Sequence, residues 1–155
     1  MTLQDVVEYF FENYPDSALS QDEVVKKDYK EEWCKDFIID RLIPYYMYDC
    51  LGLCGCGLPE ATFEVIRRYL HIKQDKHNGL IDYYGMVERY KRDLQIEYDE
   101  PIQYGMLQFL MYTLDDKGFT EHGSGIGGCW ITEDGERLLT VLDIWHEINE
   151  KGENK

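Results

Sequence analysis

The chain has 155 residues and a net charge of −15 at pH 7, a length that suits one compact domain able to bury a core without disulfides or metal. Hydrophobic residues form 44% of it and aromatic residues 14%, which excludes a disordered acidic tail. No window approaches the ~18 to 20 apolar residues of a membrane span and no basic leader begins the sequence, so we expect a soluble, cytoplasmic protein without a membrane partner.

Apolar residues at helical spacing predict two helices in the first third of the chain. The first begins after Thr2, which has the right side chain for an N-cap, and ends before Pro15. The second begins near Ser20, which forms a capping-box pattern with Glu23, and its apolar face continues to Leu42.

The middle of the chain alternates turn-like and helical segments. Residues 45–59 contain three glycines and three cysteines, which predicts a structured turn. Pro59 suits the first position of a helix that carries an apolar face to Leu70. The polar residues 71–80, with an Asn-Gly turn signal, then predict a connection to a short helix. That helix has its apolar side chains at Met86, Val87, Tyr90 and Leu94.

A further helix is predicted from Pro101, because proline is favoured at the first helical position. Gly118 is placed to end this helix in a left-handed conformation. The apolar pattern on which this prediction rests is Ile102, Met106, Phe109, Leu110 and Leu114.

A β-hairpin and a closing helix follow. Residues 119–122 and 129–132 have strand character, and the glycine-rich residues 123–128 between them suit a hairpin tip. Thr132 is placed to cap the last helix. The apolar residues of that helix repeat at intervals of three and four and predict a core face at Leu138, Val141, Leu142, Trp145 and Ile148.

Eight residues of this C-terminal region form a motif with a fixed order: helix-ending turn, hairpin, and helix-opening Ile-Thr-x-x-Gly. They are Lys117, Gly118, Phe119, Ile131, Thr132, Gly135, Leu138 and Leu139. The motif resembles the C-terminal half of a winged-helix domain. The resemblance implies a mainly α fold in which a helical bundle carries a winged-helix-like unit with a two-stranded β-hairpin, and it carries little information about activity.

We therefore predict a single compact domain over residues 1–150, with a helical part at 1–95, a winged-helix-like part at 101–148, and a disordered tail at 151–155. The combination of this C-terminal half with the Cys-Gly-Cys-Gly-Leu-Pro-Glu run of residues 54–60 is similar to uncharacterised small proteins of bacteriophages and mobile elements. That second resemblance implies no activity.

The charge distribution bears on DNA binding, the usual role of a winged helix. A DNA-binding member places basic residues on its recognition helix and wing tip. Here the helix in that position has no Lys or Arg before Lys117, and the tip is uncharged. The residues after 94 include thirteen acidic residues but only four Lys or Arg. Counterion release is then too weak for the usual affinity for duplex DNA. A DNA-binding transcriptional regulator remains the alternative, through the bases Arg67, Arg68, Arg89, Lys91 and Arg92.

The cysteine cluster is a candidate metal site. Cys50, Cys54 and Cys56 place three thiols within seven residues on a glycine-punctuated turn. A structural zinc site needs four ligands, so a fourth must come from elsewhere. The candidates for it are Cys34, His71 and His77. The alternative is that the cysteines are small, reduced, buried residues, so the cofactor prediction is either none or one structural zinc ion.

Catalytic signatures are absent from the sequence. Its serines lack the context of a nucleophile elbow, and the GSGIGG tip lacks the lysine of a phosphate loop. His122 and Cys129 lie on opposite strands of the predicted hairpin and could face each other across it. They are either a reactive thiol-imidazole pair or a half-buried structural pair of the hairpin. We predict that the protein is not an enzyme.

The acidic flanks favour a protein partner instead. Residues 1–58 carry a net charge of −7 and residues 95–155 carry −9, whereas residues 59–94 carry +1. Such a field attracts basic protein surfaces. We predict a non-enzymatic protein-binding module, for example a phage-encoded inhibitor of a nucleic-acid-binding host protein, as anti-CRISPR or DNA-mimicking proteins are. The second alternative function is a metal-binding protein that uses the Cys50–Cys56 turn. The sequence leaves the oligomeric state open, with a homodimer as one option. The predicted interaction residues are Asp115, Asp116, Glu121, Tyr83 and Tyr84.

Overall fold

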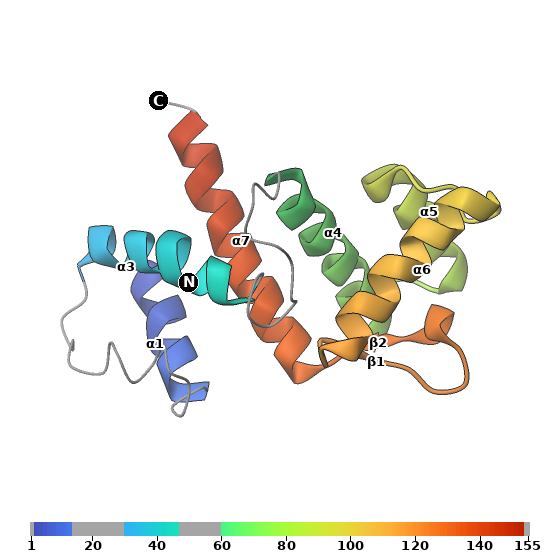
Figure 1. Ribbon diagram of the computed structural model, residues 1–155, viewed down its shortest axis with the longest axis horizontal. Coiled ribbons are helices and arrows are strands. Elements are labelled where there is room, and N and C mark those ends of the chain that lie inside the picture. Colours follow the sequence, from blue (N-terminus) through green and yellow to red (C-terminus); the bar gives the residue numbers. More distant parts are fainter. Residues whose placement is uncertain (1, 14–29, 47–59, 154–155) are drawn as a thin grey trace. The chain divides into compact units, whose positions relative to one another are not determined.

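The computed structural model describes residues 2–13, 30–46 and 60–153 (Figure 1). In these ranges the protein is mainly α-helical, with six α-helices and a short two-stranded antiparallel sheet near the C-terminal end. No helix within them is both long and apolar enough to cross a lipid bilayer. The chain forms two compact units: the first comprises Met1–Gly55 and Thr140–Lys155, and the second comprises Cys56–Leu139.

The first unit begins with helix α1 (Leu3–Asn13), which packs against helix α3. Thr2 caps α1 as predicted: its hydroxyl accepts from the Asp5 amide at 3.2 Å, and the Asp5 carboxylate accepts from the Thr2 amide at 2.8 Å. This reciprocal pair satisfies amides that the first helical turn leaves free. The residues of α1 that are fully buried are Val6, Val7 and Phe10.

Helix α3 (Glu31–Phe37) continues into a π-helical turn, η1 (Ile38–Leu42). The predicted start of this helix at Ser20 lies outside the described residues. The Trp33 ring stacks on Phe37 at 5.2 Å between centroids, which places an aromatic cluster at the contact with α1. The second half of α7 also belongs to this unit, and its predicted core face is buried at Val141, Leu142, Trp145 and Ile148.

The second unit begins with helices α4 (Glu60–His77) and α5 (Tyr83–Leu94), which pack on one another. The prediction that residues 71–80 are a connection is wrong for residues 71–77, which are the last two turns of α4. Ile72 and Lys73 are buried there, so packing extends the helix past the point where polar residues indicated its end. The turn itself is at Asn78 and Gly79, as the dipeptide predicted.

Helix α6 (Pro101–Asp116) is confirmed at both ends. The Glu100 carboxylate accepts from the amides of the first turn, and Gly118 adopts a left-handed φ of 81°. Most of the apolar residues that were predicted to form the buried side of α6 do not lie on the side that is buried. Fully buried positions are Leu107, Met111 and Leu114, whereas Ile102, Met106 and Phe109 are exposed.

The predicted hairpin is confirmed, with strands of two residues each. Strand β1 (Thr120–Glu121) pairs antiparallel with β2 (Trp130–Ile131), and a 3-10 turn, η3 (Ile126–Gly128), lies within the tip. Helix α6 packs against both β1 and η3 (Figure 1). The hairpin therefore covers one side of α6.

Helix α7 (Glu133–Glu153) begins directly after β2. The Thr132 hydroxyl accepts from the Gly135 amide at 3.1 Å and donates to the Gly118 carbonyl at 2.6 Å, so the predicted cap also joins the two ends of the hairpin. A side chain at Gly135 would overlap the Phe119 carbonyl oxygen. The helix includes residues 151–153, which were predicted to belong to a disordered tail.

Candidate protein-binding site

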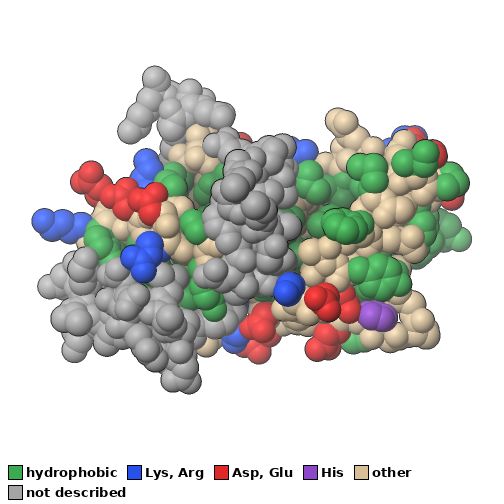
Figure 2. All heavy atoms as spheres, viewed as in Figure 1, with side chains coloured by type: hydrophobic (Ala, Val, Ile, Leu, Met, Phe, Trp, Pro, Cys, Tyr) green, Lys and Arg blue, Asp and Glu red, His purple; other side chains and the backbone are tan. Residues whose placement is uncertain are grey.

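Helix α6 presents four large apolar side chains to solvent, those of Ile102, Met106, Phe109 and Tyr112. Together with Gly105, which lies among them, they form what we call the α6 face. The exposed fractions are 75% for Ile102, 64% for Met106, 77% for Phe109 and 54% for Tyr112. Intervals of three and four residues place them on one side of the helix. Figure 2 shows hydrophobic side chains gathered over α6.

The α6 face is not needed to hold the helix on its own unit. Leu107, Met111 and Leu114 on the opposite side are 0% exposed, so that side alone supplies the core contacts of α6. Contiguous exposed apolar surface of this kind marks interaction sites on proteins. Sequence periodicity misses it because a helix that is apolar on both sides gives no indication of which side is covered.

Carboxylates bound the α6 face at both ends of the helix. Asp99 and Glu100 precede the first turn, and Asp115 and Asp116 close the last turn. The sequence from Asp93 to Asp116 contains six acidic residues and no Lys or Arg. The predicted interaction residues Asp115 and Asp116 thus lie at the C-terminal end of an apolar face, a combination that suits a partner with apolar anchors and basic flanks.

Asp115 connects α6 to the hairpin. Its carboxylate lies 2.8 Å from Nδ1 of His122 and 3.4 Å from the hydroxyl of Thr120. The His122 ring in turn meets Tyr112 edge-on at 6.4 Å between centroids, so it borders the α6 face. His122 is therefore engaged with α6, and Cys129 has other partners. The two side chains predicted to be neighbours across the hairpin lie in different surroundings.

A buried lysine fixes the hairpin tip to α4. Lys73 is 1% exposed, and its Nζ donates to the Gly127 carbonyl oxygen at 3.4 Å. The same Nζ lies 5.8 Å from the ring centroids of both Tyr69 and Tyr90, within range of cation-π attraction. Burial lowers the pKa of Lys73, and the neighbouring Cys129 thiol partly opposes that shift. Lys73 therefore sits in a site that disfavours its charge but offers several electron-rich neighbours.

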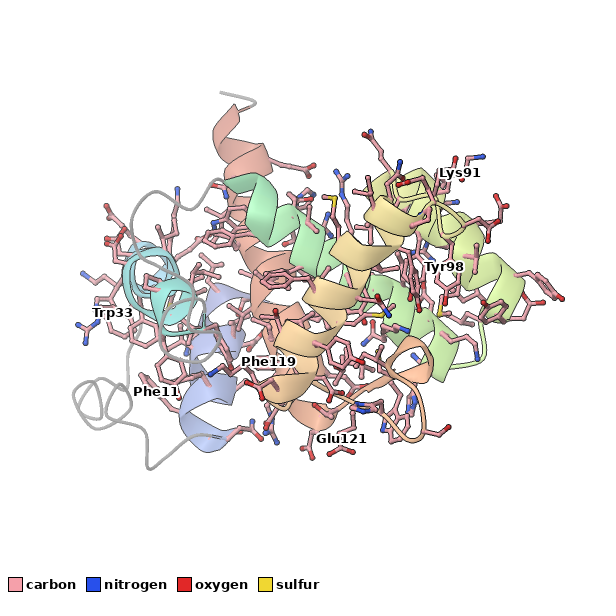
Figure 3. All side chains as sticks on the ribbon, turned by 45° about the vertical axis from the view of Figure 1, so that its right-hand side comes forward. Phe11, Trp33, Lys91, Tyr98, Phe119 and Glu121 are labelled. Carbon is pink, nitrogen blue, oxygen red and sulfur yellow. The ribbon has the colours of Figure 1, made fainter. Side chains whose placement is uncertain are left out.

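The tyrosines around Lys73 form a column. The hydroxyl of Tyr69 lies 3.1 Å from the Cys129 sulfur, and the Tyr69 ring stacks on Tyr90 at 6.3 Å. Tyr90 stacks in turn on Tyr98, which is labelled in Figure 3, with 6.1 Å between the ring centroids. Burial raises the pKa of Tyr69 and of Tyr90, so both hydroxyls stay protonated. Because Cys129 and Gly127 both belong to the hairpin, this column sets the orientation of the hairpin, and with it the support beneath α6.

The sequence analysis did not identify Lys73, although a signal was present. Lys73 follows Leu70 by three residues and Ile66 by seven, which places it on the apolar side of α4. A charged residue at such a position is rarely buried without partners. The chemistry of a lysine with a lowered pKa beside a thiol suits a general base, but both side chains are buried, and the contacts described above give them a structural role.

The remaining predicted interaction residues lie outside the α6 face. Tyr83 and Tyr84 are in the first turn of α5, with exposed fractions of 49% and 77%. Tyr83 meets Tyr98 edge-on at 6.2 Å, which joins it to the tyrosine column. Glu121, labelled in Figure 3, is exposed on β1. It pairs in the strand register with Trp130, whose side chain is also exposed.

The predicted zinc ligands are only partly within the described residues. Cys50, Cys54 and Cys56 lie outside them. Among the candidates for a fourth ligand, Cys34 belongs to α3 in the first unit, and His71 and His77 belong to α4 in the second. In the described part of the chain, no group of three or more His, Cys, Asp or Glu side chains is arranged to hold a metal ion.

The five bases behind the DNA-binding alternative are all in the second unit, on α4 and α5. Each forms an ion pair with a carboxylate, so none contributes an isolated positive charge to the surface. The pairs are Arg67 and Arg68 with Glu64, Arg89 with Asp75 and Asp93, Arg92 with Asp93, and Lys91 with Glu97.

The arrangement as a whole is an apolar helix face with acidic ends, supported from below by a hairpin that a buried lysine holds in place. Its chemistry is that of a surface for binding, with apolar anchors at the centre and charge at the rim. No protein-family model, curated protein or solved structure matches this chain.

Proposed function

We propose that the protein is a non-enzymatic, acidic protein-binding module that uses the α6 face to bind a protein with a basic surface. One observation carries the proposal: four large apolar side chains are exposed in a row on a helix whose other side is already packed. Large side chains in such a row are the kind that supply most of the affinity at interfaces.

Charge supports the same conclusion and adds a kinetic expectation. The protein carries a net charge of −15, and no basic residue lies between Arg92 and Lys117. An acidic rim steers a basic partner toward the apolar centre, which raises the association rate and makes it sensitive to salt. Apolar contacts then determine how long the complex lasts.

We further propose that α6, the hairpin and the first turn of α7 form a winged-helix-like unit in which the α6 face replaces the DNA-reading surface. The Thr132 cap and the close packing of Gly135 on Phe119 support this reading of the Lys-Gly-Phe and Ile-Thr-x-x-Gly motifs. In a DNA-binding unit the corresponding helix carries basic side chains. Here it carries apolar ones.

A concrete version of this function is inhibition of a nucleic-acid-handling protein, as phage-encoded anti-CRISPR and DNA-mimicking proteins do. A nucleic-acid-binding channel is basic, which suits the acidic flanks of this chain. The apolar α6 face would then bind beside the channel rather than imitate phosphate. In this version the inhibitor competes with nucleic acid for its target.

The test is affinity capture from a bacterial lysate at low salt with three immobilised proteins: the wild type, Phe109→Ser and Leu80→Ser. Leu80 is exposed to 72% in the turn before α5, so its substitution removes a similar apolar area outside the α6 face. We expect the wild type and Leu80→Ser to retain the same basic proteins and to release them as salt is raised. Phe109→Ser should lose them. Equal capture by all three proteins, or capture of no basic protein, contradicts the proposal.

A DNA-binding regulator is distinguished by filter binding of random duplex DNA at low salt. We expect no retention, because the bases of α4 and α5 are paired with carboxylates. Retention that weakens in an Arg68→Gln variant would favour the regulator instead. The predicted metal site is tested separately, by the zinc content of the purified protein and of a Cys54→Ser variant.

A further inference from the structure

We infer that the element bound by the α6 face is a basic amphipathic α-helix that crosses α6 at Gly105. This inference rests on the proposed function and specifies the kind of partner. It is carried by three properties of α6: an unexplained glycine, large apolar neighbours around it, and carboxylates at both ends of the helix.

Gly105 has no role in the fold of its own unit. It lies in the interior of α6, is exposed, and a Cβ built there would meet no heavy atom within 4 Å. Its φ is not in the left-handed region, because the positive values among described glycines are those of Gly79 and Gly118. Glycine in a helix interior is less stable than alanine, so alanine would serve the fold better. A residue that lowers stability and contributes nothing to the fold is typical of a functional site.

The missing side chain forms a notch in an apolar ridge. Ile102 lies one turn before Gly105, and Phe109 lies one turn after it, with exposed fractions of 75% and 77%. Met106 borders the notch on the same side of the helix. Helices pack by placing the ridges of one into the grooves of another, and a small residue at the crossing point allows the two backbones to approach closely.

A helix is the element that can cover this notch without leaving polar groups unpaired. The backbone of α6 is hydrogen-bonded internally, so it offers no partners to an incoming strand or loop. A strand or loop laid on the α6 face would bury unsatisfied amides and carbonyls against Phe109 and Ile102. A helix brings its own satisfied backbone and needs only apolar anchors one turn apart.

The ends of α6 specify a basic partner and disfavour a second copy of this chain. Asp116 is exposed at the C-terminal end, where negative charge opposes the helix dipole, and it makes no ion pair within the described ranges. Asp99 is exposed at the other end. Two copies packed through α6 would bring these carboxylates together in either direction. A helix with Lys or Arg near both ends would pair with them.

The experiment selects binders from a displayed library of helical peptides of ~20 residues, randomised along one side. The expected peptides carry apolar residues one turn apart and Lys or Arg near both ends. Gly105→Ala should weaken their binding about tenfold or more by holding the helices apart. The same substitution should raise the Tm by ~2 °C. Leu80→Ser should leave the affinity unchanged. The opposite signs of the two effects exclude misfolding as the reason for weaker binding.

The outcomes separate this inference from the proposed function. Peptides that bind wild type and Gly105→Ala equally but lose binding to Phe109→Ser overturn the crossing at Gly105 and leave the α6 face as a binding site. If the selected peptides bind Gly105→Ala and Phe109→Ser as tightly as wild type, both the crossing at Gly105 and the proposed use of the α6 face are wrong. Sedimentation of the wild type as a dimer that Phe109→Ser dissociates would assign the face to a second copy. Binding to phosphatidylcholine vesicles that Phe109→Ser abolishes would assign it to lipid.

Discussion

The Nζ atom of Lys73 lies 3.4 Å from the carbonyl oxygen of Gly127, a residue 54 positions further along the chain. This bond connects the last turns of α4 to the tip of the hairpin on which α6 rests. The amine is buried beside the stacked rings of Tyr69 and Tyr90, so the geometry of the hairpin depends on a group whose charged form burial disfavours.

The stability contributed by Lys73 should therefore depend on pH. Burial lowers its pKa from the ordinary 10.5, so between the lowered value and 10.5 the unfolded chain holds more protons than the folded one. The free energy of unfolding then rises with pH across this window. We expect Lys73→Met to remove that rise.

The measurement is urea unfolding of wild type and Lys73→Met at about pH 8 and about pH 10, below and near the reference value of lysine. Lys35→Met is the control, because Lys35 is exposed on α3, in the other unit of the chain. The stability of wild type relative to Lys73→Met should increase with pH, and relative to Lys35→Met it should stay nearly constant. A pH-independent difference for Lys73→Met would refute the burial argument.

The Thr132 hydroxyl should contribute more to the free energy of unfolding than an ordinary helix cap does. It accepts from Gly135 and donates to the Gly118 carbonyl, so Thr132→Val loses both hydrogen bonds while keeping the shape of the side chain. We expect a loss of about 1 to 2 kcal/mol in the free energy of unfolding. Thr132→Ser keeps the hydroxyl and should lose less than half as much, as measured by chemical denaturation. A loss in Thr132→Val no larger than that in Thr132→Ser would show that the hydroxyl contributes no more than the methyl group and would contradict this prediction.

Two glycine-to-alanine substitutions should act in opposite directions. A Cβ at Gly135 overlaps the Phe119 carbonyl oxygen and comes within 2.7 Å of Ile131 Cγ1, so the first turn of α7 must move away from the hairpin. We expect Gly135→Ala to destabilise the protein by about 1 to 3 kcal/mol. Gly105→Ala faces open space and should stabilise it by about 0.5 to 1 kcal/mol. Thermal unfolding followed by circular dichroism measures both. A stabilised Gly135→Ala variant would contradict the packing described for Gly135, and a destabilised Gly105→Ala variant would contradict the open space described for Gly105.

Removing the carboxylate of Asp116 should also stabilise the free protein. Its charge lies at the negative end of the α6 dipole, and Asp116→Asn removes that repulsion, for an expected gain of about 0.3 to 1 kcal/mol at low salt. Glu88→Gln is the control, since Glu88 is exposed in the middle of α5. The difference between the two variants should shrink when the same thermal scans are repeated at high salt. A loss of stability in Asp116→Asn would mean that the carboxylate has a stabilising role in the fold.

Several element ends could be predicted from the sequence, because the interactions that define them are local. Thr2, Thr132 and Gly118 act on amides and carbonyls a few residues away, and all three do what their positions predicted. The end of α4 could not be predicted in this way. Its last two turns carry many polar side chains, and their helical structure goes with the burial of Ile72 and Lys73 in the folded protein.

The exposure of the α6 face could not be predicted by local reasoning. Both sides of α6 are apolar, so the sequence determined that a helix begins at Pro101 but not which side of it faces the solvent. The tertiary structure decided that: α6 packs against the hairpin held by Lys73, and in the folded unit Leu107, Met111 and Leu114 are buried while Phe109 stays exposed. The physical reason is that capping and helix propensity act over one turn, whereas burial depends on contacts between segments that are distant in the chain.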